Sequence, residues 1–216
     1  MSRIVFHTIL ISLGVFLFTV FYLFLERGAF SLGVVNRAFA HTALILIGIS
    51  FALSSMCYFW NFLDSKIVYR KDIGLSGFAF AMAHGIISFW FLPNRFPFPE
   101  YYLASENILS FIFAVSALFI YVIMAAISNR FATHLLGGML WRYLLRLGYV
   151  AYIYTILHFA LQEYEKWTNW FAHREALTPP SGLFLFLFGM VVLLLRIALW
   201  VALLRKAKGS ESTTVE

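Results

Sequence analysis

Long apolar segments dominate the pattern of hydrophobic and polar positions along this chain, and short polar segments separate them. A helix needs about 20 apolar residues to cross the hydrocarbon core of a bilayer. Six candidate segments are present: Ile4–Leu25, Ala40–Phe62, Ile73–Leu92, Ile108–Ile127, Leu147–Leu161 (with an extension back to Leu140) and Leu183–Leu204. The pattern predicts an all-α integral membrane bundle of six transmembrane helices, with both termini on one side of the membrane.

The polar segments leave no room for a separate soluble domain. Only Pro93–Asn107 and Gln162–Pro180 are long enough to carry local structure. The first apolar segment is too long for a signal peptide, and no cleavage site of small residues follows it. We therefore expect one transmembrane domain over residues 1–208 and a polar, disordered tail over residues 209–216.

Composition supports the same class of protein. Of the 216 residues, 62% are hydrophobic and 12% are charged, and the mean hydropathy is +0.85, which excludes an ordinary soluble domain. The net charge of +6 comes from basic residues at the ends of the apolar segments, so it indicates membrane topology and not nucleic-acid binding. The single cysteine, Cys57, excludes a disulfide framework and a cysteine-ligated zinc or iron–sulfur site.

The basic residues also predict the orientation in the membrane. Three groups fall on one side: Lys66, Arg70 and Lys71; Arg130, Arg142 and Arg146; and Arg205, Lys206 and Lys208. The positive-inside rule makes this side cytoplasmic, so both termini are expected in the cytoplasm. The expected location is the cell (inner) membrane, with lipid as the surrounding partner.

Two histidines, His84 and His158, lie in the middle of the third and fifth apolar segments. Each lies eleven residues after the first apolar residue of its segment, so both are about 16 Å deep. Ionisable groups at that depth are functional candidates by default. Small residues precede them along one helical face: Gly77 and Ala81 before His84, and Gly148, Ala151 and Thr155 before His158. The pattern favours a flat ligand between two parallel helices, and one haem b with a histidine on each side of its iron fits it.

A polar contact between packed helices is the alternative interpretation of these histidines, because small residues at such spacing also mediate plain helix packing. The matched depth favours haem. The other histidines are expected near the membrane surfaces: His7, His41, His134 and His173. His41 and Arg37 are also candidates to bond a haem propionate. Arg196 either marks the end of the last span, which we favour, or pairs with a propionate or a glutamate.

Two stretches resemble the ferric reductase-like transmembrane domain family. Arg70–His84 (RKDIGLSGFAFAMAH) looks like its third span, in which a basic pair and an Ile-Gly-Leu run lead to a haem histidine. Trp141–His158 (WRYLLRLGYVAYIYTILH) looks like its fifth span, and the likeness covers about residues 35–165. Within the family the chain is most similar to the haem-binding membrane subunit of the periplasmic methionine sulfoxide reductase system. The resemblance implies electron transfer from a quinol or cytosolic flavin donor to an outside acceptor.

The chain departs from that family where a second haem would bind. Leu145 and Pro97 stand at the positions of the further histidines, so one haem is expected. No glycine fingerprint of a dinucleotide-binding domain is present. An oxidoreductase subunit of this kind needs a separate donor (a quinol or a flavoprotein) and a separate acceptor, with a partner reductase subunit as one candidate. Two alternative functions stay open: a transporter or channel subunit, and a haem-free membrane scaffold.

Overall fold

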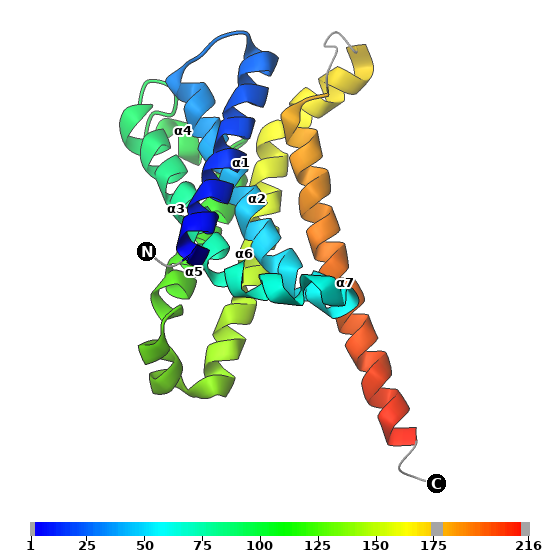
Figure 1. Ribbon diagram of the computed structural model, residues 1–216. Coiled ribbons are helices and arrows are strands. Elements are labelled where there is room, and N and C mark those ends of the chain that lie inside the picture. Colours follow the sequence, from blue (N-terminus) through cyan, green and yellow to red (C-terminus); the bar gives the residue numbers. More distant parts are fainter. Residues whose placement is uncertain (1–2, 174–178, 213–216) are drawn as a thin grey trace.

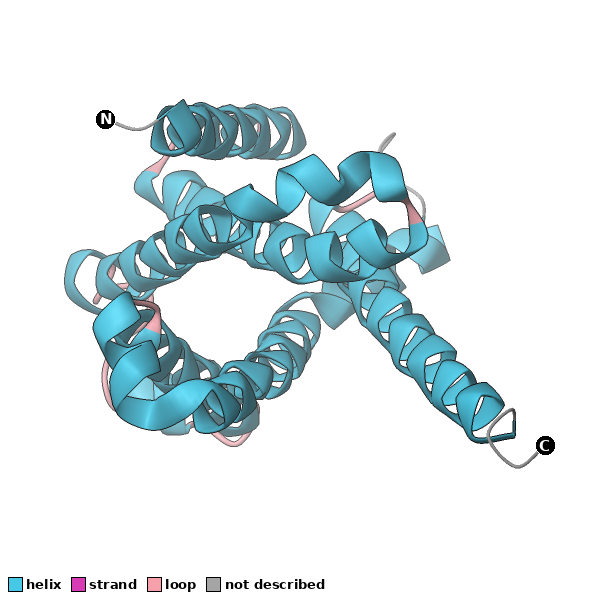
Figure 2. Cartoon of the chain, turned by 60° about the horizontal axis from the view of Figure 1, so that its bottom comes forward, coloured by secondary structure: helices cyan, strands magenta, loops and turns pink. Residues whose placement is uncertain are grey.

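Six helical segments long and apolar enough to cross a membrane dominate the computed structural model, which describes residues 3–173 and 179–212 (Figure 1). The regular structure within these residues is entirely helical, so the prediction of an all-α bundle with six candidate spans is confirmed. The elements are α1 (Arg3–Arg27), α2 (Leu32–Phe59), the 3-10 helix η1 (Asn61–Tyr69), α3 (Arg70–Ile86), the π-helical turn η2 (Ile87–Phe91), α4 (Glu100–Leu103), α5 (Ile108–Ile127), α6 (Arg130–His173) and α7 (Ser181–Ser212). Figure 2 shows short loops between them, with the first and last helices at the edge of the bundle.

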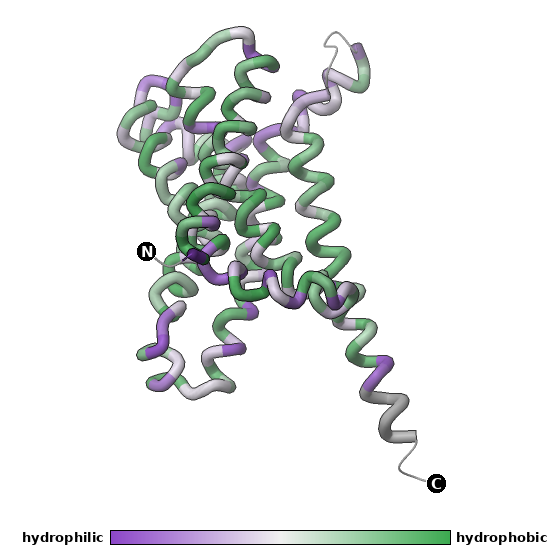
Figure 3. The backbone as a smooth tube through the Cα atoms, in the orientation of Figure 1, coloured by the Kyte–Doolittle hydropathy of each residue, from purple (hydrophilic) through white to green (hydrophobic). Residues whose placement is uncertain are grey.

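Apolar residues fill the middle of the helices, and polar residues gather toward the two ends of the bundle (Figure 3). Large apolar side chains on the outside are exposed, among them Phe18 at 65%, Phe119 at 65% and Trp200 at 62%. Lipid would cover such a surface, which is the architecture of a multi-pass membrane protein. We call the end with residues 28–31 and 92–107 the upper end, as drawn in Figure 1, and the end with η1 and residues 128–140 the lower end.

Helix α2 begins at Leu32, well before the predicted start at Ala40. Ser31 has extended backbone angles, and its side-chain oxygen accepts a hydrogen bond from the Val34 amide, so it caps the helix N-terminus. The apolar run located the membrane-spanning part, but the cap decides where the helix starts. As a result His41 lies more than two turns inside α2 and is buried, and its position near the membrane surface stays a prediction.

Helices α6 and α7 also extend past their predicted bounds. α6 runs from Arg130 and turns sharply at Gly137, whose φ of 71° is in the left-handed region that favours glycine. α7 continues through Ser212, so residues 209–212 of the predicted tail are helical, and residues 213–216 lie outside the described part. The helix does not end near Arg196, and where the membrane-spanning part of α7 ends stays a prediction. That guanidinium stacks on the ring of Tyr149 from α6, with 4.5 Å from its central carbon to the ring centroid.

Helix α2 is the centre of the bundle. It buries 61% of its most apolar stretch, whereas α1 buries 22%. It packs closely on α3, and α5 packs closely on α6, while contacts between these two pairs are sparse. The main core cluster joins the pairs through α2, α6 and α7, with Phe51, Tyr152 and Val192 among its members. The two predicted haem histidines therefore sit on different pairs: His84 on α3 and His158 on α6.

Candidate functional site

His84 is held against helix α2 through one ring nitrogen. Its Nδ1 lies 3.1 Å from the carbonyl oxygen of Asn36 and 3.1 Å from the side-chain Oδ1 of the same residue. A carbonyl oxygen only accepts, so Nδ1 carries the proton and donates it. Asn36 is itself buried, and its Nδ2 donates to Ser88 at 2.8 Å. This arrangement fixes the tautomer of His84 and leaves a lone pair on Nε2.

His158 is held against helix α5 in the same way. Its Nδ1 lies 3.0 Å from the carbonyl oxygen of Ser110 and 2.9 Å from the Ser110 hydroxyl. The Ser110 hydroxyl donates to the His158 carbonyl at 3.3 Å and accepts from Gln162 Nε2 at 3.0 Å. In both cases the partner lies 48 residues before the histidine. Each helix pair thus presents one imidazole with Nδ1 engaged and Nε2 available.

Neither histidine is sealed into the core. Both side chains are of intermediate exposure; His84 lies near the end of α3, and His158 lies well inside α6. Among the described residues, neither Nε2 forms a hydrogen bond within the protein. Two imidazoles with Nδ1 bonded and Nε2 unbonded are the kind of nitrogen donor that a metal centre uses.

A bare metal ion does not fit this donor set. The described residues contain no group of three or more His, Cys, Asp or Glu side chains that would hold a metal ion. A porphyrin supplies four equatorial nitrogens of its own and needs only axial ligands from the protein. Two imidazoles from opposite helix pairs therefore fit haem better than they fit zinc or another bare ion.

The backbone changes immediately after His84. α3 ends at Ile86, and the chain widens into the π-helical turn η2. The amide of Ile87 is shared between the carbonyls of Ala83 and His84. Beside His84, a Cβ added at Gly85 would meet only Leu118 on α5, at 3.9 Å. Such π-helical turns are frequent at functional sites, and this one leaves α3 loosely packed toward α5 at the level of the histidine.

The small residues predicted to clear space for haem lie mostly at helix contacts. A Cβ added at Gly77 would come within 2.7 Å of Ile47, and one at Gly148 within 2.7 Å of Phe51. Ala151 is fully buried in the core cluster. Here these three residues let α3 and α6 approach α2 and α5 closely, which is the packing role that small residues play in membranes. Their contact with a cofactor stays a prediction.

Ala81 and Thr155 have different surroundings. Ala81 is half-buried on α3, three residues before His84. The Thr155 hydroxyl donates to the Ala151 carbonyl at 2.9 Å and shares a hydrogen bond of 3.0 Å with the hydroxyl of Tyr121 on α5. The hydroxyl of Thr155 therefore ties α6 to α5 one turn below His158.

Arg37 and His41 lie on α2, one and five residues after the Asn36 that holds His84. Arg37 Nη2 is 3.3 Å from Glu163 Oε1 on α6, and Lys166 Nζ is 2.6 Å from the same oxygen. His41 is 2% exposed and packs edge-on against Phe159, with its Nε2 lacking a hydrogen-bond partner. The structure thus brings Arg37 and His41 close to the site, and a propionate contact stays a prediction. His7, His134 and His173 are exposed.

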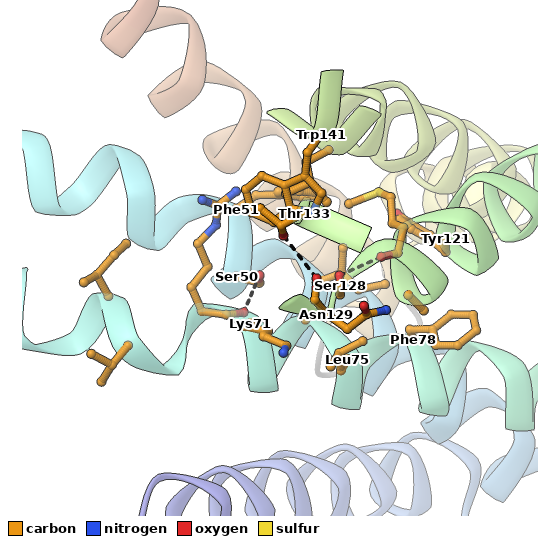
Figure 4. A pocket seen from close by; sticks show the side chains of 18 of the residues that line it. Ser50, Phe51, Lys71, Leu75, Phe78, Tyr121, Ser128, Asn129, Thr133 and Trp141 are labelled. Atoms are coloured by element: carbon orange, nitrogen blue, oxygen red, sulfur yellow. Dashed lines mark hydrogen bonds between the residues drawn. The ribbon is translucent and has the colours of Figure 1, made fainter. Parts of the chain in front are cut away.

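A second feature lies toward the lower end, and neither histidine lines it. A pocket of about 440 Å³ opens between α2, α3, α5 and α6 (Figure 4). Its mouth is lined by Arg70, Lys71 and Arg130, and its upper wall includes Phe78 and Tyr121. Tyr121, which lines this lower pocket, shares a hydrogen bond with Thr155, three residues before His158. Leu145, the position of a further histidine in the resembling family, also lines the lower pocket.

Sequence reasoning missed Asn36 and Ser110, the two residues that orient the imidazoles. Ser110 is a polar residue near the start of an apolar segment. Asn36 directly precedes Arg37, near the start of the second span. Isolated polar residues facing a helix neighbour are the signal that would have singled them out.

Comparison of the sequence with known protein families and curated proteins identified no relative. No protein-family model matches the chain, and a search of curated proteins found no match. The likeness to the ferric reductase-like transmembrane domain therefore stays a resemblance. The function has to be argued from the site itself.

Proposed function

We propose that this protein is a haem b-binding membrane electron-transfer protein, with His84 and His158 as the axial ligands of one haem. The observation that carries the proposal is the matched anchoring of the two imidazoles, each bonded through Nδ1 to a neighbouring helix. A metal-ligating histidine commonly donates its other ring N–H to a carbonyl, which fixes the ring and raises its basicity. Helix packing alone does not require the same nitrogen to be engaged on both sides.

The residues around the pair define what the site does. A haem with two imidazole ligands has no open coordination position, so it supplies one-electron transfer and not oxygen binding. Asn36 and Ser110 hold the rings against rotation. Arg37 keeps one buried nitrogen, Nη1, without a partner, so it is available to a carboxylate at the upper side of the site.

The electrons must come from and go to other molecules. The proposed donor is a quinol or a flavoprotein, and the proposed acceptor is a separate protein or small molecule on the other side. The lower pocket, with three basic residues at its mouth, supports approach of a donor from that end. The proposed location is the inner membrane, with the lower end in the cytoplasm.

The test is a reduced-minus-oxidised absorption spectrum of protein purified from cells supplied with haem. We expect one b-type haem per chain, lost in His84→Ala and in His158→Ala. His134→Ala, on an exposed histidine of the same helix as His158, is the matched control and should keep the haem. A folded wild-type protein without haem overturns the proposal.

Two other outcomes would favour the alternative functions. Solute flux in liposomes without a redox couple would favour a transporter, and unchanged function without both histidines would favour a scaffold.

A further inference from the structure

Three arginines converge on a small pocket at the upper end of the bundle. The pocket has a volume of about 220 Å³ and lies between the end of α1, the start of α2 and the loop after η2. Arg27, Arg37 and Arg95 line it, one from each of these segments, together with Ser31 and Gly33. We call it the arginine pocket. It is separate from the proposed haem ligands, none of which lines it.

The nearby carboxylates do not balance these charges. Glu163 is already shared between Lys166 at 2.6 Å and Arg37 Nη2 at 3.3 Å. Glu26 Oε2 accepts hydrogen bonds from the amide and the hydroxyl of Ser181, at 3.2 and 2.6 Å. Within the described part of the chain, Arg27 and Arg95 have no carboxylate within ion-pair distance. Positive charge therefore accumulates in the arginine pocket.

Arg37 has an unused donor beside the same pocket. Its Nη2 is bound to Glu163, but its Nη1 is buried and has no hydrogen-bond partner. A buried guanidinium nitrogen without a partner is costly, and a ligand that accepts from it would remove that cost. The three like charges also repel one another, so an anion among them would lower the energy of all three.

The backbone at the start of α2 suits an anion as well. A Cβ added at Gly33 would come within 2.8 Å of Arg95 Nη1, so glycine lets Arg95 lie across the first turn of the helix. The amino end of a helix carries partial positive charge and attracts anions. Guanidinium groups match the oxygens of phosphate in pairs, which makes arginine the usual residue for such ligands.

We propose that the arginine pocket binds a phosphate group, supplied either as free phosphate or as the headgroup of a phospholipid. Three guanidiniums and the start of α2 surround the pocket, and a tetrahedral oxyanion accepts from several of these donors at once. The proposal does not rest on haem binding. It gives the upper end a ligand site built mainly by Arg27 and Arg95, and Arg37 is the one residue that it shares with the proposed propionate contact.

The first arm of the test uses inorganic phosphate with full-length protein in detergent, after removal of lipid. Calorimetric titration at constant ionic strength should show binding to the wild type and about tenfold weaker binding to Arg95→Gln. Arg130→Gln, which removes a charge from the lower pocket, is the matched control and should bind like the wild type. Gly33→Ala keeps every charge but pushes Arg95 aside, so it should also weaken binding.

The second arm uses native mass spectrometry of the protein in nanodiscs of phosphatidylglycerol. Retention of this lipid by the wild type and Arg130→Gln, and its loss in Arg95→Gln, identifies a lipid headgroup as the source of the phosphate. Phosphate binding without lipid retention identifies the free anion. If Arg95→Gln matches Arg130→Gln in both arms, or if nothing binds in either arm, the proposal is wrong. Circular dichroism of each variant checks that it is folded, and the haem spectrum should not change in any of them.

Discussion

At the scale of single residues, the two ring nitrogens of each central histidine have different tasks. A buried polar atom without a partner costs about 1–3 kcal/mol, and folded proteins avoid such atoms. His84 and His158 satisfy Nδ1 with oxygens of Asn36 and Ser110, yet both leave Nε2 open. His41 also has an open Nε2, but it is sealed against Phe159 and is only 2% exposed. The two half-exposed imidazoles are therefore better placed than His41 to reach an iron.

The Ser110 hydroxyl gives a test of this anchoring, which depends on the proposed function. In Ser110→Ala the His158 Nδ1 loses the hydroxyl at 2.9 Å but keeps the Ser110 carbonyl at 3.0 Å. We expect haem affinity to fall about tenfold, the lower end of the usual range for such partners. The midpoint potential should rise, because a less firmly bonded imidazole donates less electron density to the iron. Haem titration and a redox titration measure the two effects.

The control for this prediction lies on the same helix. Ser116 is a half-buried serine of α5 that is not bonded to either histidine within the described residues. Ser116→Ala should leave both haem affinity and potential unchanged. Equal effects of the two substitutions would mean that the serine hydroxyls act through general packing of α5 and do not orient His158.

At the scale of helices, glycine decides how close the partners of each pair can come. A Cβ at Gly77 would lie 2.9 Å from the backbone nitrogen of Ile47 on α2, and a backbone atom cannot move aside cheaply. The same atom at Gly85, on the same helix, would meet nothing nearer than 3.9 Å. Close approach of α2 and α3 therefore depends on Gly77 and not on Gly85.

Gly77→Ala should consequently destabilise the protein by about 1–3 kcal/mol, the cost of overpacking a close contact. Gly85→Ala is the matched control and should be neutral or slightly stabilising, because alanine favours the helix more than glycine does. Thermal unfolding of the two variants in the same detergent, without haem, measures the difference. A loss of stability of equal size in both would show that the α2–α3 contact does not depend on Gly77.

The elements show where the sequence was informative and where it was not. Apolar length located all six spans, because bulk hydrophobicity over about 20 residues is what a bilayer requires. It did not locate the start of α2, which the Ser31 cap sets, or the turn in α6 at Gly137. The central histidines were found by depth. Asn36 and Ser110 were not found, because contacts across 48 residues depend on which helices pair, and helical periodicity does not encode that.

At the scale of the whole molecule, charge divides the bundle into two different ends. The lower pocket is lined by three basic residues, Arg70, Lys71 and Arg130. The upper end also carries basic residues, but Glu163 there neutralises part of the charge of Arg37 and Lys166. The positive-inside rule depends on this asymmetry, so the lower end is the one predicted to face the cytoplasm. An electron donor from the cytoplasm would then meet the lower pocket, and the arginine pocket would face outward.

Cysteine labelling tests this orientation, since the chain has a single cysteine. In a Cys57→Ser background, Ser65→Cys adds a thiol to exposed η1 at the lower end, and Ser105→Cys adds one to the exposed upper loop. A membrane-impermeant maleimide added to intact spheroplasts should label only Ser105→Cys. After permeabilisation it should label both introduced cysteines. The cysteine-free background controls for non-specific labelling. Labelling of Ser65→Cys alone before permeabilisation would invert the topology, and the donor would then have to approach from outside.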